Sequence, residues 1–343
     1  MPGSRRLAQL CLVLVSLWIA MIMTVGHVLA GEIRDTIEDR GYLKCGIEET
    51  TPFFSKINPL ENAAREFCQA ITIALFHDKN AFKIISIPHG RNTDFLVSNS
   101  VDLVMLAGIN NFEKSHKTVL SAPLLVNGFA LLNLKGDSDP KKLNGKRICT
   151  LNNKQNNVNL AVFGQKHQIS FSVLSYKTPE QLRKAASRQE CGAIALSRIN
   201  LLQFKLKILS NFPFAQVINS TSGSPKLGIL VSSRDQEWIN ITSWFGHALI
   251  EAEIENITST NIDLIASASI DPTVQVLLGL KGNLGLTLGL DKQWAYRVIK
   301  SHGNYREIYQ RHFGEKSSFP IKRDPIALLL GETTHKKSYS DFN

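Results

Sequence analysis

The chain has 343 residues, of which 43% are hydrophobic and 20% are charged. This apolar fraction excludes wholesale disorder and collagen-like or low-complexity classes, and the length indicates two domains. The formal net charge of +10 leaves three kinds of partner open, namely a nucleic acid, a membrane surface or an anionic small molecule.

The first thirty residues are typical of a signal peptide. Arg5 and Arg6 precede an apolar run from Leu7 to Val25, and residues 28–30 (VLA) supply the small-residue pattern that a signal peptidase cleaves. The run is nearly long enough to span a bilayer, so a retained membrane anchor is the alternative, although polar residues interrupt it. We therefore predict export to the periplasm with removal of residues 1–30.

Four cysteines follow the predicted signal peptide, and their spacing bears on disulfides. The separations of 23, 81 and 42 residues resemble no zinc site, and scattered histidines add no metal-ligand spacing, so no metal is expected. An even number of cysteines in an exported chain favours disulfides. Of three connectivities the local one is simplest, Cys45 with Cys68 and Cys149 with Cys191. Four reduced, buried thiols are the alternative.

Short apolar strands alternate with amphipathic helices along the first half of the chain. The predicted strands are 43–47, 82–87 and 101–107, and the predicted helices are 61–76 and 94–98. The β-prone segment Gly128–Leu134 then leads to a charged stretch, Lys135–Lys142, which contains Gly136 and Pro140. We predict that this stretch crosses from one domain to the other.

The alternation begins again after this stretch. The predicted strands are 147–151, 171–176, 193–196 and 227–231, the predicted helices are 158–166, 179–187 and 292–313, and a further helix carries a core-facing stripe of Trp238, Ile241, Phe245 and Leu249. The small-residue stretch 219–226 fits a second crossing. Alternating strands and helices imply mainly parallel sheets. We predict an α/β protein with residues 31–134 and 226–343 in lobe 1 and residues 135–225 in lobe 2.

Two exported α/β lobes joined by two crossings match a clamshell that closes on a solute, and several segments resemble such a family. Residues 40–46 (RGYLKCG) and 66–70 (EFCQA) resemble the first strand and first helix of periplasmic binding proteins for polar amino acids. Residues 286–300 (LTLGLDKQWAYRVIK) and 303–309 (GNYREIY) are similar to the C-terminal signature of the general L-amino-acid-binding proteins of ABC uptake systems, solute-binding protein family 3.

The resemblance runs from about residue 36 to 325 and has clear implications for fold and partners. It implies a type II periplasmic binding protein clamshell whose first lobe is discontinuous. The general L-amino-acid-binding proteins have all four cysteines in similar settings. It implies an amino acid as the small-molecule ligand and an ABC permease in the inner membrane as the partner. We expect a monomer that needs no cofactor. We also expect no nucleic-acid binding, because the basic residues of the chain are dispersed.

The resemblance breaks down in the expected ligand pocket. The family clamps the ligand carboxylate with an Arg in lobe 1 where this chain has Lys114, and a lysine lacks the planar two-pronged fork. The family holds the ligand ammonium with an Asp in lobe 2 where this chain has Ser197. The residues carried over as ligand-binding are Phe54, Asn111, Lys114, Asn153, Lys154 and Ser197. Loss of the acid and gain of Lys154 predict a more positive pocket.

Three interpretations of this pocket stay open. The chain binds a polar L-amino acid, or a different and more anionic solute, or no solute at all. A dehydratase-like enzyme on the same fold is a remote alternative that would use Glu48, Glu49 or Glu113 as acid or base. No serine nucleophile motif or phosphate-binding loop is present, so we predict no catalytic residue and a solute-binding subunit, not an enzyme.

Overall fold

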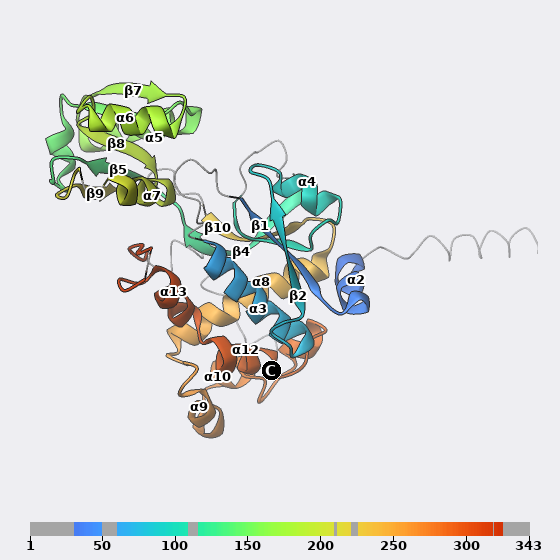
Figure 1. Cartoon of the computed structure of the whole chain (residues 1–343). Coiled ribbons are helices and arrows are strands. Elements are labelled where there is room, and N and C mark those ends of the chain that lie inside the picture. Colours follow the sequence, from blue (N-terminus) through green and yellow to red (C-terminus); the bar gives the residue numbers. More distant parts are fainter. Residues whose placement is uncertain are drawn as a thin grey trace, which may run out of the picture.

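The computed structural model describes residues 31–49, 60–108, 116–208, 211–220, 226–317 and 319–324. They form two lobes with one five-stranded sheet each, which confirms the predicted two-lobed α/β fold (Figure 1). Within these ranges, no helix has the length and apolar character needed to cross a membrane. The predicted signal peptide, Phe54, Asn111, Glu113 and Lys114 lie outside the described residues.

Sheet A of lobe 1 has the strand order β2-β1-β3-β10-β4, in which β1 is parallel to β2 and β3 while β10 runs antiparallel to β3 and β4. Its strands are β1 (Leu43–Glu48), β2 (Phe82–Ile87), β3 (Leu103–Ala107), β4 (Thr118–Val126) and β10 (Lys226–Ser232). β4 is not predicted from the sequence, because Pro123 interrupts its apolar pattern. A proline is tolerated there since β4 lies at the edge of the sheet.

Helices cover sheet A and extend lobe 1 on the side away from lobe 2 (Figure 1). They are α2 (Glu32–Arg40), α3 (Glu61–Phe76), α4 (Asn92–Val97), α8 (Gln236–Ile254), α9 (Ile262–Ala268), α10 (Pro272–Leu277), α11 (Leu284–Thr287), α12 (Trp294–His302) and α13 (Tyr305–Phe313). The predicted stripe on α8 is confirmed, since all four of its side chains are buried in the main core. The bounds of α3 agree with the predicted helix at both ends.

The prediction of one long helix over residues 292–313 is wrong, because the chain breaks between α12 and α13. Gly303 adopts a φ of 82°, which ends α12. Asn304 then starts α13 with a capping box, in which its side chain accepts from the Glu307 N–H and the Glu307 carboxylate accepts from the Asn304 N–H. The sequence therefore contains both the stop and the start signal inside a continuous apolar periodicity.

Sheet B of lobe 2 has the order β7-β6-β8-β5-β9. Its strands are β5 (Phe129–Asn133), β6 (Arg147–Leu151), β7 (Ser172–Tyr176), β8 (Ala193–Ser197) and β9 (Gln216–Asn219), and its helices are η2 (Pro140–Leu143), α5 (Lys154–His167), α6 (Pro179–Ser187) and α7 (Arg198–Ile208). Strands β6, β7 and β8 are parallel, whereas β5 pairs antiparallel with β8 and β9.

The placement of the first crossing at Lys135–Lys142 is wrong. β5 belongs to sheet B, so the chain passes between the lobes after β4 ends at Val126 and before Phe129. All five residues of β5 are buried, which is the pattern of a central strand in either sheet. The sequence pattern therefore identifies the strand but not the sheet that it joins. The return lies between β9 and β10, that is, between Asn219 and Lys226.

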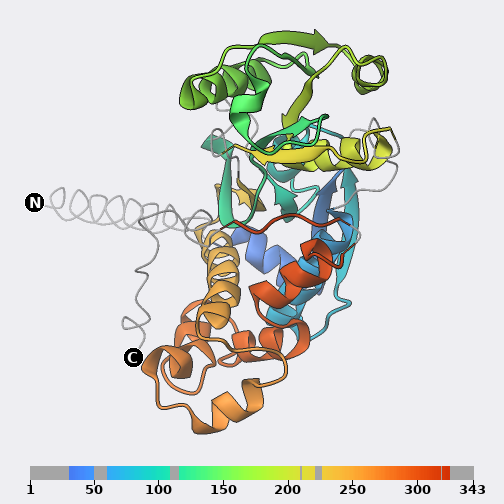
Figure 2. The ribbon, with the colours of Figure 1, turned by 90° about the vertical axis from the view of Figure 1, so that its left-hand side faces the viewer.

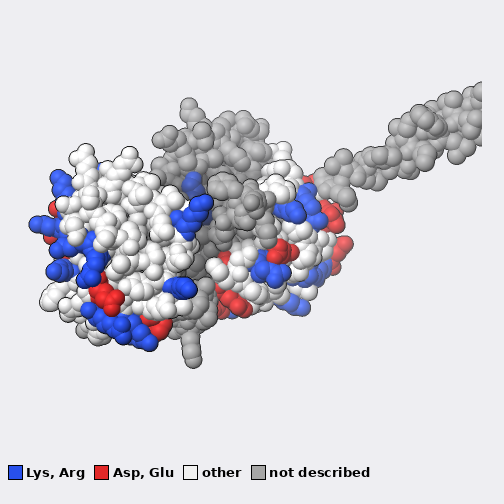
Figure 3. All heavy atoms as spheres, turned by 90° about the horizontal axis from the view of Figure 1, so that it is seen from above, with Lys and Arg blue, Asp and Glu red and all other residues white. Residues whose placement is uncertain are grey.

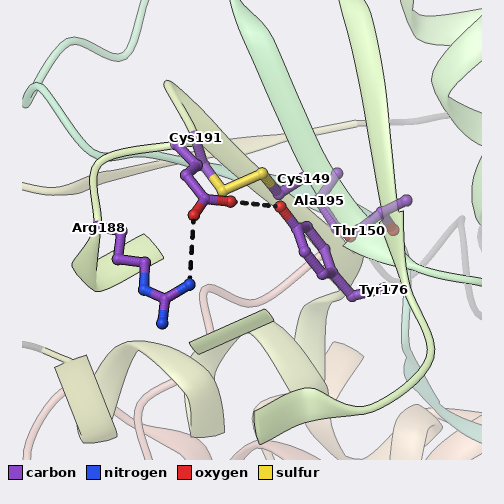
Figure 4. Close-up of a disulfide and its surroundings, with 7 residues drawn as sticks. Cys149, Thr150, Tyr176, Arg188, Cys191 and Ala195 are labelled. Carbon is purple, nitrogen blue, oxygen red and sulfur yellow. Dashed lines mark hydrogen bonds and ion pairs between the residues drawn. A yellow bond between two sulfur atoms is a disulfide. The ribbon is translucent and has the colours of Figure 1, made fainter. Parts of the chain in front are cut away.

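Both predicted disulfides are present in the structure. Cys45 of β1 is joined to Cys68 of α3 with a Cα–Cα distance of 6.4 Å, and Cys149 of β6 is joined to Cys191 just before β8 with a Cα–Cα distance of 5.6 Å. Figure 4 shows the second bridge beside Tyr176, whose hydroxyl donates to Glu190 at 3.0 Å. Each bridge lies within one lobe, as the local connectivity predicts.

A partly buried ion cluster joins α3 to α13 and gives lobe 1 a pH-dependent contact. Glu66 of α3 accepts from His312 at 2.5 Å and pairs with Arg311. Burial acts to raise the pKa of Glu66. Hydrogen bonds from His312 and Arg311 nevertheless hold this pKa below its ordinary value of 4.5. A lowered carboxyl pKa contributes stability that is present above pH 4.5 and is lost as the pH falls through the folded-state value.

We therefore expect Glu66→Gln to lower the free energy of unfolding at pH 7 by about 1–2 kcal/mol. The difference between the variant and the parent protein should shrink as the pH falls from 4.5 through the lowered folded-state pKa, because the Glu66 carboxyl then becomes protonated in the folded chain as well. Urea unfolding curves at pH 7, 5 and 3 measure this. A difference of equal size at all three pH values would contradict an electrostatic origin.

Candidate functional site

A cavity of about 400 Å³ lies between the two lobes. Its walls are built from the carboxyl ends of the parallel strands of both sheets, and from the residues that follow them. In open parallel sheets this edge is where ligands bind, because side chains and helix starts converge there. The polar lining residues are Glu48, Glu49 and His89 from lobe 1, Asn127 from the crossing, and Asn152, Asn153, Lys177, Ser197 and Asn200 from lobe 2.

Glu48, at the end of β1, is held by three donors on the lobe 1 wall. Its carboxylate accepts from His89 Nδ1 at 2.7 Å, from the Gly90 N–H at 2.8 Å and from Asn92 Nδ2 at 2.6 Å. Burial acts to raise its pKa, but these hydrogen bonds hold the pKa below the ordinary value. The hydrogen bond to Glu48 raises the pKa of His89 in return. Each of the two side chains therefore stabilises the charged form of the other.

Glu49 follows Glu48 and is exposed on the same wall. Its backbone N–H donates to the Ile87 carbonyl at 2.8 Å and so continues the hydrogen-bond ladder between β1 and β2. This bond fixes the backbone of Glu49 relative to β2. Its carboxylate accepts from the Ser86 hydroxyl at 2.8 Å. Among the described residues, no Lys, Arg or His pairs with this carboxylate. The lobe 1 wall therefore presents one carboxylate without a counter-charge from the described chain.

Lys177 lies opposite, between the end of β7 and the start of α6. Its backbone N–H donates to the Gln181 side chain at 3.1 Å, and Thr178 and Gln181 form the capping box that starts α6. These bonds fix the backbone at Lys177 and leave its ammonium exposed. In the described part of the chain, no carboxylate pairs with that ammonium. The lobe 2 wall therefore presents an ammonium to which the described residues supply no counter-charge.

The structure brings together two of the residues that the resemblance predicts. Asn153 and Ser197 both line the cavity. Asn153 caps α5, since its side-chain oxygen accepts from the Gln155 N–H at 2.7 Å. Lys154 is the first residue of α5 and is exposed, but it is not among the lining residues. The role of each of these residues in ligand binding stays a prediction.

The expectation of a pocket with lysines and no acid does not hold for the described walls. Glu48 and Glu49 line the cavity, and the lining lysine is Lys177. The sequence offers a signal for all three, since each stands at or directly after the carboxyl end of a parallel strand. The family resemblance instead places the charged ligand contacts elsewhere in the chain, at the positions of Lys114 and Ser197.

The excess positive charge of the chain does not gather at one site on the face seen from above. There Lys and Arg side chains are scattered over both lobes and mixed with Asp and Glu (Figure 3). Within the described ranges, no group of three His, Cys, Asp or Glu side chains could hold a metal ion.

A third contact joins the lobes beside the two crossings. Ile199, in the first turn of α7, packs into the main core of lobe 1, and its N–H donates to Asn127 Oδ1 at 3.1 Å. Arg198 is buried and pairs through both terminal nitrogens with Asp324, at the end of the segment that follows α13. Figure 2 shows this C-terminal segment reaching the boundary between the lobes. These contacts fix the start of α7 at the cavity.

The comparisons with known proteins agree with this geometry, although no family model matches the chain. YhdW of Escherichia coli (strain K12), named as an amino-acid ABC transporter-binding protein, is 26% identical over 310 residues, which cover 88% of this chain and 91% of YhdW. The general L-amino acid-binding periplasmic protein AapJ of Rhizobium johnstonii is 25% identical over 321 residues, which cover 90% of this chain and 93% of AapJ.

A solved structure supports the fold independently. The ABC transporter periplasmic binding protein from Brucella ovis, with glutathione bound, superposes with a TM-score of 0.66 at 23% identity. The match covers 85% of this chain and 94% of that protein. The two-lobed periplasmic binding protein fold predicted from the sequence is therefore confirmed.

Proposed function

Because the chain is a homologue of amino-acid ABC transporter-binding proteins, we propose that it is the solute-binding subunit of an ABC uptake system and binds a polar L-amino acid. The observation that carries the proposal is the interlobe cavity, whose walls come from the carboxyl ends of both sheets. A solute that contacts both walls stabilises the closed arrangement of the lobes over the open one. Residues 1–30 export the protein to the periplasm, where it delivers its solute to the permease as a monomer.

The lining charges favour a zwitterionic solute over the anionic alternative. Glu49 on lobe 1, which pairs with no cation among the described residues, would repel an anion, whereas Lys177 on lobe 2 supplies the only lysine ammonium among the described lining residues. An amino acid carries both an ammonium and a carboxylate, and it can satisfy both signs of charge. The amides of Asn152, Asn153 and Asn200 add donors and acceptors for a polar side chain.

The enzyme alternative receives no support from the two described carboxylates in the cavity. A general acid at neutral pH needs a raised pKa, but hydrogen bonds lower the pKa of Glu48 and occupy its oxygens. Glu49 shares no hydrogen bond with a second acid or base among the described residues. We therefore propose binding without catalysis.

Calorimetry tests the proposal on protein purified from the periplasm after expression of the full chain. We expect saturable heat, with one solute per chain, for at least one of the twenty L-amino acids. Glutathione belongs in the same panel, because the solved Brucella ovis protein holds it. Saturation by glutathione alone would identify a different solute, and absence of heat from every compound would contradict the proposal in favour of a non-binding scaffold.

A further inference from the structure

The positive charge of the chain is divided unequally between the lobes. Residues 129–219, which run from the start of β5 to the end of β9, contain 14 of the 39 Lys and Arg residues but 4 of the 29 Asp and Glu residues. Residues 31–128 and 220–343 contain 23 Lys and Arg residues against 25 Asp and Glu residues. Both signs of charge are visible on both lobes from above (Figure 3), yet the excess comes from lobe 2.

The fold gathers half of the lobe 2 cations at one edge of sheet B. The carboxyl ends of β6, β7 and β8 meet the cavity, so their amino ends form the opposite edge, which faces away from lobe 1. Strand β5 ends at this edge because it runs antiparallel to β8, and α5 and α6 end there because each leads to the next parallel strand. The exposed cations of this edge, which we name the basic edge, are Lys135, Lys141, Lys142, Lys146, Arg147, Lys166 and Arg188.

Backbone hydrogen bonds hold the basic edge together. The Gly192 N–H donates to the Arg147 carbonyl at 2.7 Å, and the Leu134 N–H donates to the Gly192 carbonyl at 3.2 Å. These bonds join the starts of β6 and β8 to the end of β5. The Ser172 N–H donates to the Lys146 carbonyl at 3.1 Å and so adds the start of β7. Cations that are dispersed along the sequence therefore lie on one ordered surface.

Three carboxylates accompany the seven cations of the basic edge. Asp137 and Asp139 accept from backbone N–H groups of their own loop, at 2.8 and 2.9 Å. Glu190 accepts from the Tyr176 hydroxyl at 3.0 Å and pairs with Arg188 at 3.9 Å (Figure 4). The edge therefore keeps an excess of positive charge after its acids are counted.

The excess is greatest around η2 and the start of β6. In the described part of the chain, no carboxylate forms a salt bridge with the four cations there, Lys141, Lys142, Lys146 and Arg147. The residues of lobe 2 outside the described ranges, 209–210 and 221–225, include no Asp or Glu. Residues 135–147 contain no aromatic residue on which a nucleic-acid base could stack. The chemistry of this edge therefore suits a surface of phosphate groups.

We propose that the basic edge of lobe 2 holds the protein at a membrane surface rich in anionic phospholipids. Each Lys or Arg close to such a surface strengthens binding by about fivefold, and the effect falls off within a Debye length. Cations on one ordered edge reach the surface together, whereas cations spread around the protein do not. The contact leaves the cavity, at the opposite edge of sheet B, uncovered. It does not depend on the solute that the cavity binds, so failure of the proposed function leaves this inference standing.

Cosedimentation with vesicles tests the inference on protein purified from the periplasm. The vesicles contain phosphatidylcholine alone or with about 30% phosphatidylglycerol, at about 50 mM and about 300 mM salt. The basic-edge variant carries four substitutions, Lys141→Gln, Lys142→Gln, Lys146→Gln and Arg147→Gln. The matched control has the same net charge and loses four exposed cations of lobe 1, through Lys79→Gln, Lys281→Gln, Lys292→Gln and Lys316→Gln.

We expect the parent protein to bind the phosphatidylglycerol vesicles at least about tenfold more strongly than phosphatidylcholine vesicles, and to be released at the higher salt concentration. The basic-edge variant should lose at least about tenfold of this binding. The control variant should stay within about threefold of the parent protein, because its lost cations lie on the other lobe.

Other outcomes overturn the inference. Equal loss of binding in the two variants would show that net charge, not the basic edge, causes it. If the parent protein binds both kinds of vesicle equally, or neither, anionic lipid is not the partner, and this comparison needs no variant to fold. Binding to a short DNA duplex without binding to the vesicles, measured by fluorescence anisotropy in the same buffer, would identify a nucleic acid as the partner instead.

Discussion

Replacing both Cys149 and Cys191 by alanine is expected to lower the free energy of unfolding of lobe 2 by about 4 kcal/mol, by the loop-entropy relation for a bridge spanning 42 residues. The bridge ties β6 to the residue before Gly192 and β8, so it constrains the centre of sheet B. Lobe 2 has small separate cores on the two faces of that sheet and has less apolar surface with which to offset the loss.

Two spectroscopic signals separate the lobes in this experiment. The tryptophans that follow the predicted signal peptide are Trp238, Trp244 and Trp294, and all three lie in the core of lobe 1. In urea, tryptophan fluorescence therefore follows lobe 1, whereas far-ultraviolet circular dichroism follows both lobes. We expect the double variant to shift part of the dichroism transition to lower urea and to leave the fluorescence transition in place.

The other disulfide provides the matched control. Replacing Cys45 and Cys68 by alanine should shift the fluorescence transition, with an expected loss of about 3 kcal/mol for its 23-residue separation. If the Cys149 and Cys191 variant moved neither signal, the bridge would contribute nothing to stability. If both pairs of substitutions moved both signals equally, the lobes would unfold as one unit rather than separately.

Trp238→Ala is expected to destabilise lobe 1 by about 3–5 kcal/mol, the usual cost of truncating a buried aromatic side chain. Trp238 is fully buried at the start of α8, and its indole N–H donates to the Asp102 carbonyl at 2.9 Å. The alanine variant loses the packing and leaves a cavity between α8 and sheet A. Urea unfolding followed by the fluorescence of Trp244 and Trp294 measures the change.

Trp238→Phe separates packing from hydrogen bonding at the same position. The phenyl ring retains much of the buried volume but leaves the Asp102 carbonyl without its donor, for an expected cost of about 1–2 kcal/mol. The alanine variant should therefore unfold at clearly lower urea than the phenylalanine variant. Equal midpoints for the parent protein and Trp238→Ala would contradict the central place of this side chain in lobe 1.

Much of the fold follows from local patterns in the sequence. The period of the apolar residues predicts α3 and the buried stripe of α8, and the alternation of strands and helices predicts two α/β lobes. The errors lie where tertiary contacts decide. β5 has the same buried pattern in either sheet, and only its pairing with β8 and β9 assigns it to lobe 2. Pro123 hides β4, because its tolerance depends on an edge position that the sequence does not show.

The candidate site is only partly predictable for a related reason. Asn153 and Ser197 reach the cavity because they stand at the carboxyl ends of strands that are themselves predictable. Glu49 and Lys177 share that property, but their relation across the cavity depends on how the two lobes face one another. The contact between Glu48 and His89 likewise depends on the parallel pairing of β1 and β2, since His89 follows β2. Local sequence patterns alone do not give contacts between elements.

The central claim is that a solute bound between the lobes brings them together. Small-angle X-ray scattering measures this directly on the periplasmic protein, with and without a saturating concentration of the L-amino acid identified by calorimetry. We expect a smaller radius of gyration in the presence of that amino acid, and no change with an amino acid that gives no heat. Saturable binding with an unchanged radius of gyration would contradict it.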